Sequence, residues 1–234
     1  MAKNREGVAV HTMHPASSGG PVFYGSLPDD KENCKELLIA TLWNHHQATA
    51  GPFRNRCRSS GRAAGPIRVV SGLLGRPHLH LGEFRGPAIS FSRGGGKMWG
   101  ALSGDESDVG IDVAGSAEFQ GAYPLQRVFH PEELHHASKV TDGNREEAAA
   151  LLWSVKEAVV KALGCGFHLV DPRQIFVHPS DGGEAGVTFP VCLSGKALAR
   201  FPLASGRFLR VHSLPRERMW LSIAFFTTRA PVHG

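Results

Sequence analysis

The feature that most restricts the fold of this chain is the helical pattern at residues 144–164, NREEAAALLWSVKEAVVKALG, the longest in the sequence. Gly164 closes the pattern, as glycine often does at the end of a helix. Four segments that alternate or run apolar like strands follow it: RQIFVHP (173–179), GVTFPVCLS (186–194), FLRVHSLP (208–215) and MWLSIAFF (219–226). A helix followed by consecutive strands predicts a small antiparallel sheet. The lack of regular strand–helix alternation argues against a doubly wound nucleotide-binding fold.

The first half of the chain has a less regular pattern. Residues 1–28 are rich in Gly, Ser and Pro and are predicted to be a loose leader. Residues 29–51 combine an acidic start with an apolar stripe, which predicts a helix that stops at Gly51 and Pro52. Three further patterns are predicted: strands AISFS (88–92) and KMWGALS (97–103) around a glycine turn, a buried strand DVGIDVAG (108–115), and a short helix HPEELHHASKV (130–140) opened by Pro131.

The composition is that of an ordinary soluble protein, with 234 residues, 41% hydrophobic and 20% charged. The four cysteines are scattered without a C-x-x-C pair, which argues against a zinc site or a disulfide framework and suits a reducing cytoplasm; they are Cys34, Cys57, Cys165 and Cys192. Neither a signal peptide nor a transmembrane helix is predicted. The formal charge of +5 favours anionic partners.

The long helix carries charged residues among Ala, Val and Leu. Trp153, Glu157 and Lys161 are spaced by four and share one face, whereas Lys156 projects about 100° away. Taken alone, Glu157 and Lys161 have the spacing of a common solvated ion pair. Burial-prone Trp153 on the same face favours a functional site instead. So does the Gly-Cys-Gly segment after the helix, whose backbone N–H groups could approach an anion.

Asp112 ends the apolar run of VGID and allows two interpretations. It could cap a turn or the next helix, or it could place a carboxylate at a sheet edge where metals and phosphates bind. Magnesium takes hard oxygen ligands, often one or two carboxylates together with substrate phosphate oxygens. Asp112 and Glu157, which belong to different predicted elements, could supply two such ligands.

Other polar motifs are weaker. FSRGGG is a glycine-rich turn with a cation but no P-loop, and Arg76–Pro77 places a basic residue in a stiff turn. The histidine pairs 45/46, 78/80 and 135/136 have no metal-ligand spacing and are interpreted as surface or turn residues. The arginines between Arg54 and Arg68 could form a solvated loop, a phosphate site or a patch that binds a carrier protein.

VGIDVAG followed about 40 residues later by WSVKEAVVKALGCGF resembles the two signature motifs of the 4′-phosphopantetheinyl transferases. GRP, FSRGGGKMWGAL and VFHPEEL resemble three further elements of that family, in the same order across residues 74–167. The length resembles the Sfp-type, in which one chain holds two similar halves. The resemblance implies an α+β fold, two similar α/β halves with small antiparallel sheets related by a pseudo-twofold. Residues 29–108 would form the N-terminal half, and residues 109–234 would form the C-terminal half that carries the metal and catalytic motifs.

The resemblance also implies the chemistry. Such enzymes transfer the 4′-phosphopantetheine arm of coenzyme A to a serine of an apo acyl or peptidyl carrier protein and release 3′,5′-ADP, with Mg2+ or alternatively Mn2+. The carriers serve fatty-acid, polyketide or non-ribosomal peptide synthesis. The implied metal ligands are Asp112 and Glu157, and the implied catalytic residues are Glu157, Lys161 and Glu133. The implied coenzyme A contacts are Arg76, Pro77, Ser92, Arg93, Asp112, Lys156 and Lys161.

Two positions depart from the family pattern. Ala114 stands where the family often has a second acid after the Asp, and Arg93 replaces a histidine. These departures support an alternative, a degenerate family member that binds coenzyme A or a carrier protein without transfer. A nucleic-acid-binding protein is a third interpretation, but the chain lacks interleaved aromatic residues and any helix-turn-helix or RNP motif. We therefore expect a cytoplasmic, monomeric transferase with no nucleic-acid or membrane partner.

Overall fold

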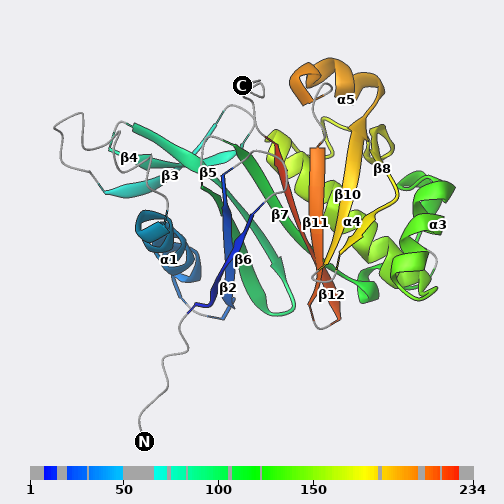
Figure 1. Cartoon of the computed structure of the whole chain (residues 1–234), viewed down its shortest axis with the longest axis horizontal. Coiled ribbons are helices and arrows are strands. Elements are labelled where there is room, and N and C mark those ends of the chain that lie inside the picture. The colour runs from blue at the N-terminus through cyan, green and yellow to red at the C-terminus, as the bar shows by residue number, and fades with distance from the viewer. Residues whose placement is uncertain are drawn as a thin grey trace, which may run out of the picture.

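The computed structural model describes residues 8–14, 20–30, 32–49, 66–72, 75–82, 84–104, 107–121, 123–183, 186–204, 209–216 and 218–226. Two antiparallel sheets and the helices around them make up this part of the chain (Figure 1). The α+β prediction with one sheet in each half is confirmed. The pseudo-twofold and the halves as independent domains stay predictions.

The first sheet has the strand order β1-β2-β6-β5-β4-β3. Its strands are β1 (Val10–Met13), β2 (Val22–Pro28), β3 (Ile67–Ser71), β4 (Pro77–Leu81), β5 (Phe84–Gly94) and β6 (Lys97–Ser103). Helix α1 (Cys34–Thr49) confirms the helix predicted within residues 29–51, although Gly51 and Pro52 lie outside the described residues. Arg54, Arg56, Arg58 and Arg62 also lie outside them, whereas Arg68 is on β3.

The second sheet has the order β7-β12-β11-β10-β8, and β9 pairs with β10. Its strands are β7 (Asp108–Gly115), β8 (Ile175–Val177), β9 (Asp181–Gly183), β10 (Gly186–Leu193), β11 (Leu209–Arg216) and β12 (Met219–Phe226). Its helices are α3 (Pro131–Val140), α4 (Arg145–Leu163) and α5 (Gly195–Arg200), with short 3-10 turns η1 (Ser116–Phe119), η2 (Leu125–Arg127), η3 (Pro172–Gln174) and η4 (Pro202–Ala204). The long helix, the short helix, the buried strand and the four-strand antiparallel prediction are all confirmed.

The two sheets pack face to face, and one long helix covers the outer face of each. Strand residues of both sheets, such as Trp99 of β6 and Ile111 and Ile223 of the second sheet, form one buried cluster between them. Leu38 and Leu42 of α1 pack on the outer face of the first sheet. The buried face of α4 packs on the outer face of the second sheet. The layers are therefore α1, sheet, sheet, α4, as Figure 1 shows from left to right.

The prediction of a loose leader over residues 1–28 is wrong, because β1 and β2 lie within it. Along β2 the side chains alternate between the two faces of the first sheet. Val22 and Tyr24 lie in the cluster between the sheets, and Phe23 and Leu27 pack against α1. Gly, Ser and Pro in the neighbouring sequence hid this period-two pattern. None of the helices in the described part of the chain combines the length and hydrophobicity that a bilayer span requires.

Candidate active site

Strand β7 presents Asp112 to helix α4. Val109, Ile111 and Val113 point into the cluster between the sheets, so the alternate residues 110, 112 and 114 face α4. Gly110 lets the helix approach: a Cβ at this position would clash with the backbone of Ala158 and Ala162. The glycine of VGID therefore allows α4 to lie in backbone contact with β7, which brings the helix side chains within reach of Asp112.

Asp112 is 6% exposed and is held from two sides. Lys161 Nζ donates to Asp112 Oδ1 at 2.7 Å and to the carbonyl oxygen of Ile111 at 3.3 Å. Ser92 of β5 donates its hydroxyl to the same Oδ1 at 2.8 Å. Burial raises the pKa of Asp112, and the Lys161 ammonium and the two hydrogen bonds oppose that rise. The carboxylate thus joins β7, α4 and the first sheet at one point.

Glu157 lies one helical turn before Lys161 and is half-buried. Burial raises the pKa of Glu157, the charge of Asp112 raises it further, and Lys161 opposes both. Two carboxylates that repel each other beside one ammonium group form a centre to which a divalent cation is attracted.

The donor set fits magnesium. Within the described residues there is no group of three or more His, Cys, Asp or Glu side chains that could hold a metal. Magnesium is commonly bound by only one or two carboxylates, with water and substrate phosphate oxygens in its other positions. Asp112 and Glu157 satisfy that requirement, whereas a site built entirely from protein ligands is not found in this part of the chain.

A cavity of about 360 Å³ opens beside this centre. Its lining combines three cations with apolar side chains: Lys35, Phe91, Ser92, Arg93, Met98 and Lys161. Lys35 of α1 lies over the ring of Phe91, with Nζ 4.9 Å from the ring centroid. The Lys161 ammonium therefore reaches Asp112 from the wall of a cationic cavity.

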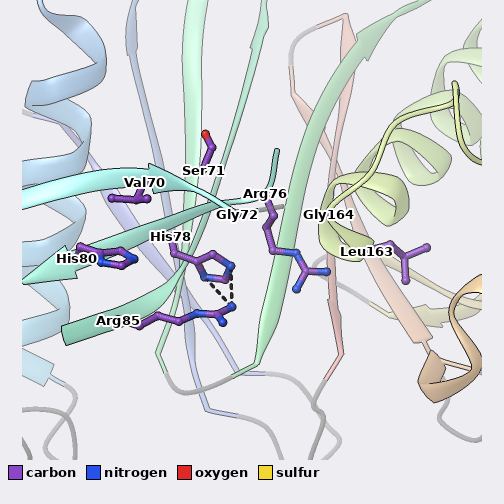
Figure 2. Close-up of a pocket in the computed structure, with 9 residues that line it drawn as sticks. All are labelled: Val70, Ser71, Gly72, Arg76, His78, His80, Arg85, Leu163 and Gly164. Carbon is purple, nitrogen blue, oxygen red and sulfur yellow. Dashed lines mark hydrogen bonds between the residues drawn. The ribbon is translucent and has the colours of Figure 1, made fainter. Parts of the chain in front are cut away.

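A second cavity of about 460 Å³ lies at the other end of the contact between α4 and β7 (Figure 2). Arg76 enters it and forms an ion pair with Asp108, the first residue of β7. The Arg76 side chain lies against Gly164, so closely that a Cβ there would clash with it. Gly164 has φ +74° and ends α4, so the guanidinium stands at the negative end of the helix dipole.

The charge of this second cavity is carried by arginine. Figure 2 shows Arg85 and His78 pointing toward each other, and Arg85 Nη2 lies 2.8 Å from His78 Nε2. Burial lowers the pKa of His78 to about 4, and the nearby Arg85, Arg76 and His80 contribute to that lowering. His78 is therefore neutral near pH 7. Arg76 is balanced by Asp108, and Arg85 adds a net positive charge.

Part of the chain matches a known protein family. Residues 108–206 match the family model of the 4′-phosphopantetheinyl transferase superfamily. The match starts at the first residue of β7 and includes Asp112, Glu157 and Lys161, but neither Arg76 nor Ser92.

Three individual proteins are also similar to the chain. A protein of Gloeobacter violaceus named holo-[acyl-carrier-protein] synthase is 39% identical over 88 residues, which are 37% of this chain and 61% of that protein. The apo-ACPS structure of Chronobacterium ammoniagenes covers 51% of this chain and 94% of its own, with 23% identity and a TM-score of 0.41. An ACPS–CoA complex of the same organism covers 54% of this chain and 100% of its own, with 21% identity and a TM-score of 0.43.

Two residues of the superfamily motifs do not lie at the Asp112 centre. Lys156 and Glu133 have fully buried side chains, and Lys156 Nζ lies 2.9 Å from Glu133 Oε2. Lys156 also donates to the carbonyl oxygens of Val128 and Pro172, and Glu133 accepts from the backbone N–H groups of His130 and Val177. In this structure neither side chain reaches the Asp112 centre, and the expected coenzyme A contact of Lys156 and base role of Glu133 stay predictions. The pair ties α3 and β8 to α4.

The remaining predicted residues lie around the two cavities. Ser92 and Arg93 line the smaller one, but Ser92 is committed to Asp112, and Arg93 is largely exposed and pairs with Asp29 at 3.0 Å. Pro77 begins β4 directly after Arg76. Ala114 is 1% exposed in the apolar cluster beneath α4, so the departure from the family pattern places a methyl group on the same face of β7 as Asp112.

The structure adds residues that the sequence did not single out. Lys35 lines the smaller cavity, and Arg85, with His78 and His80, lines the larger one. Lys35 lies in an amphipathic helix whose function left no signal in the sequence. His78 and His80 were interpreted as turn or surface residues, yet both are on β4, and their alternating positions in a strand could have indicated one face.

Proposed function

We propose that the chain transfers the 4′-phosphopantetheine arm of coenzyme A to a serine of an apo acyl or peptidyl carrier protein, with Mg2+, and releases 3′,5′-ADP. One observation carries the proposal. Lys161, which lines a cationic cavity, places its Nζ 2.7 Å from Asp112 Oδ1, and Glu157 lies one helical turn before it. The Gloeobacter relative named holo-[acyl-carrier-protein] synthase supports this assignment, although the matched region spans only 61% of its length.

Asp112 and Glu157 would hold Mg2+, which would supply positive charge against the pyrophosphate of coenzyme A. The serine hydroxyl attacks the β-phosphorus, and the bond from that phosphorus to the oxygen of 3′,5′-ADP breaks. The serine proton passes to Glu157 or to a water that Glu157 positions.

Lys161 neutralises charge on the phosphate as it is transferred. Its ammonium is fixed by Asp112 and by the Ile111 carbonyl, so it needs little reorganisation when negative charge develops. Ser92 acts by orienting the Asp112 carboxylate through their hydrogen bond. Arg76 and Arg85 make the larger cavity suitable for the phosphorylated nucleoside of coenzyme A, because an arginine can bind phosphate through two parallel N–H groups.

The acyl or peptidyl carrier would meet a basic protein. The net charge of +5 favours association with acidic partners, and coenzyme A is itself an anion. A monomer fits the packing, because the two sheets of one chain cover each other's apolar faces. A cytoplasmic location is part of the proposal, because the scattered cysteines, without a C-x-x-C pair, suit a reducing compartment.

Intact mass spectrometry tests the proposal. The purified chain, coenzyme A and Mg2+ are incubated with several apo acyl and peptidyl carrier proteins, and each carrier is weighed. A phosphopantetheine adduct on at least one carrier, absent when EDTA is added, is the expected result. Coenzyme A binding without an adduct on any carrier would instead support the non-catalytic alternative.

A further inference from the structure

Three buried serines form a continuous chain of hydrogen bonds behind the Asp112 centre. Ser154 Oγ of α4 lies 2.7 Å from Ser222 Oγ of β12, and Ser222 Oγ lies 2.7 Å from Ser213 Oγ of β11. Ser154 Oγ also lies 2.9 Å from the carbonyl oxygen of Leu151. All three serines are 0% exposed. The chain therefore joins the long helix to two strands of the sheet in a region closed to water.

The three serines can donate their hydrogen bonds in only one direction, from Ser213 to Ser222 to Ser154. A serine hydroxyl has a single proton to donate and can accept two hydrogen bonds. Ser154 donates to the Leu151 carbonyl, which has no proton to offer, so Ser154 must accept from Ser222. Ser222 has then used its proton and accepts from Ser213. Each of the three serine hydroxyl protons therefore has an acceptor, as buried polar groups require.

The row of hydrogen-bonded serines lies beside the carboxylates of Asp112 and Glu157. Ser222 is the register partner of Asp112 on the adjacent antiparallel strand, so their side chains stand next to each other on the face of the sheet beneath α4. Ser154 precedes Glu157 by three residues and shares its face of the helix. On α4 the neighbour of Glu157 is thus Ser154, and on the sheet the neighbour of Asp112 is Ser222. The Ser154–Ser222 hydrogen bond therefore lies next to these two carboxylates.

Two polar links from α4 to the sheet bracket Glu157. The Ser154–Ser222 bond lies before it, and the Lys161–Asp112 bond lies after it. Ser154 and Lys161 are seven residues apart, about two helical turns or roughly 10 Å along the axis. Fixing both ends of this segment fixes the rotation of α4 about its axis, and with it the direction in which the Glu157 carboxylate points.

We propose that Ser154, Ser222 and Ser213 are positioning residues that set the rotation of α4, so that Glu157 and Asp112 converge on one divalent cation. The proposal rests on the proposed function, which assigns these two carboxylates to the metal. Serine is a small residue, and small residues at these three positions allow the helix to approach the sheet, as Gly110 does. Alanine at the three positions would allow the same approach. At these three positions a hydroxyl, unlike the methyl group of alanine, provides a directional link between helix and sheet.

The test compares the triple variant S154A/S213A/S222A with the unchanged protein. Removing all three hydroxyls leaves no serine without a partner, so the loss of stability should be smaller than in S222A, which strands the proton of Ser213 and a lone pair of Ser154. Mn2+ is titrated into each protein without carrier, and the free ion is followed by electron paramagnetic resonance. The Km for Mg2+ and the kcat of transfer are measured separately, together with the melting temperature.

Ser138→Ala is the matched control. Ser138 Oγ donates to the carbonyl oxygen of His135 at 2.9 Å, three residues back in α3, and the structure shows no second hydroxyl bonded to it among the described residues. It reproduces the local helix bond of Ser154 without the link to the sheet. Its Mn2+ affinity and its Km for Mg2+ should equal those of the unchanged protein.

We expect the triple variant to bind Mn2+ roughly tenfold more weakly, with a matching rise in the Km for Mg2+, because groups that orient metal ligands typically cost that much when removed. A weakening of less than about threefold would overturn the proposal, since groups with a structural role alone would lower only the melting temperature. If the triple variant does not fold, S154A, which removes only the helix hydroxyl of the link to the sheet, is judged by the same limits.

Absence of Mn2+ binding by the unchanged protein would also overturn the positioning proposal. Mn2+ binding without transfer by the unchanged protein would sink the proposed function but not the positioning role.

Discussion

Lys156 and Glu157 are adjacent in sequence and have opposite environments. Lys156 is fully buried and is neutralised by Glu133, whereas Glu157 is half-buried and faces the charge of Asp112. The helix rotates by about 100° per residue, which sends the two side chains to different sides of α4. One motif thus contributes one residue to packing and one to the proposed chemistry.

Replacement of Glu157 by Gln should abolish transfer and stabilise the fold. Burial and the Asp112 charge raise the pKa of Glu157, so its ionised form is disfavoured in the folded state. Removing that charge should raise the melting temperature near pH 7, by about 2–4 °C per kcal/mol relieved in a chain of this size. Intact mass of the carrier and thermal unfolding measure the two effects, with exposed Glu132→Gln as the control. A variant with near-normal transfer would contradict the assigned role.

The difference in melting temperature between Glu157→Gln and the unchanged protein should depend on pH. Because the folded pKa of Glu157 exceeds the unfolded value of 4.5, the folded state takes up this proton first as pH falls. The free energy of unfolding of the unchanged protein therefore gains a contribution as pH falls through the folded pKa, complete below 4.5. Glu157→Gln lacks this contribution, so the difference in melting temperature between the two proteins should shrink from pH 8 to pH 4. A difference independent of pH would show that Glu157 titrates normally.

Lys156→Met and Lys161→Met should have opposite consequences. The first leaves the buried Glu133 carboxylate without its ammonium partner, a change that typically costs about 3–5 kcal/mol of unfolding free energy. The second removes the partly exposed ammonium beside Asp112, so transfer should be lost, and the loss of stability should be smaller because Ser92 still donates to the Asp112 carboxylate. Chemical denaturation and carrier mass separate the two. Glu133→Gln in the Lys156→Met background should recover part of the lost stability; no recovery would mean that the pair is not what holds α3 to α4.

Asp112, Glu157 and Lys161 could be predicted as one group, because the resemblance supplied their roles and the structure brings the three side chains together. Lys156 and Glu133 could not be placed in the same way, because their side chains pair with each other away from Asp112. A motif shows that a position requires a given residue type, but a buried ion pair imposes that requirement as strongly as substrate contact does. The 100° rotation of Lys156 from the face of Glu157 was visible in the sequence and was the better guide to its place.

At the scale of the elements, the contact between β7 and α4 decides where the site can form. The approach depends on the missing side chain of Gly110 at the middle of the contact and on Gly164 at its end. Arg76 lies over Gly164 and pairs with Asp108, so the end of the helix is tied to the start of the strand. Glycines at these two points therefore set the distance between α4 and β7, and with it the spacing of Asp112, Glu157 and Lys161.

Gly110→Ala should push α4 away from β7. The new methyl group would clash with the backbone of Ala158, which cannot move aside as a flexible side chain can. We expect a loss of unfolding free energy of about 1–3 kcal/mol and weaker Mn2+ binding, as for other overpacked interiors. Gly115→Ala on the same strand is the control, since a Cβ there would meet its nearest atom, Met219 Cγ, at an ordinary 3.5 Å. Equal effects of the two substitutions would refute the role given to Gly110.

The elements of the second half could be predicted from periodicity because each is long or regular. The short strands β1 and β2 could not, since Gly, Ser and Pro surround them and β1 has only four residues. Their order in the sheet also depends on pairing with β6, which is far away in sequence. Such long-range pairing leaves no local pattern, so the error over residues 1–28 has a definite physical origin.

At the scale of the whole molecule, the superfamily match covers the second sheet from β7 to β10 together with its helices, while β11 and β12 of that sheet lie beyond it. Yet the inner face of that sheet is apolar and is covered by the first sheet, through residues such as Val109, Ile223 and Phe225. The first sheet also supplies Ser92 to the Asp112 centre. The region that resembles shorter relatives thus depends on the rest of the chain for burial and for one site contact.

A fragment of residues 107–234 should therefore self-associate or bind a hydrophobic dye when produced alone. Its inner sheet face would expose side chains that are buried in the whole chain, and exposed apolar faces of this kind drive association. Sedimentation and dye fluorescence measure this, and adding residues 1–106 in trans should reverse it. A monomeric fragment that binds no dye and unfolds cooperatively would show that the second half is self-sufficient.

The Ser92–Asp112 hydrogen bond crosses from β5 to β7 and so from one sheet to the other. Occupation of the Asp112 centre should therefore slow amide hydrogen exchange in β5 and β6 as well as in β7 and α4. Replacement of Ser92 by Ala should weaken this spread of protection from the second sheet to the first. The remaining coupling would come from the apolar cluster that the two sheets share and from the Ser90–Ile111 hydrogen bond.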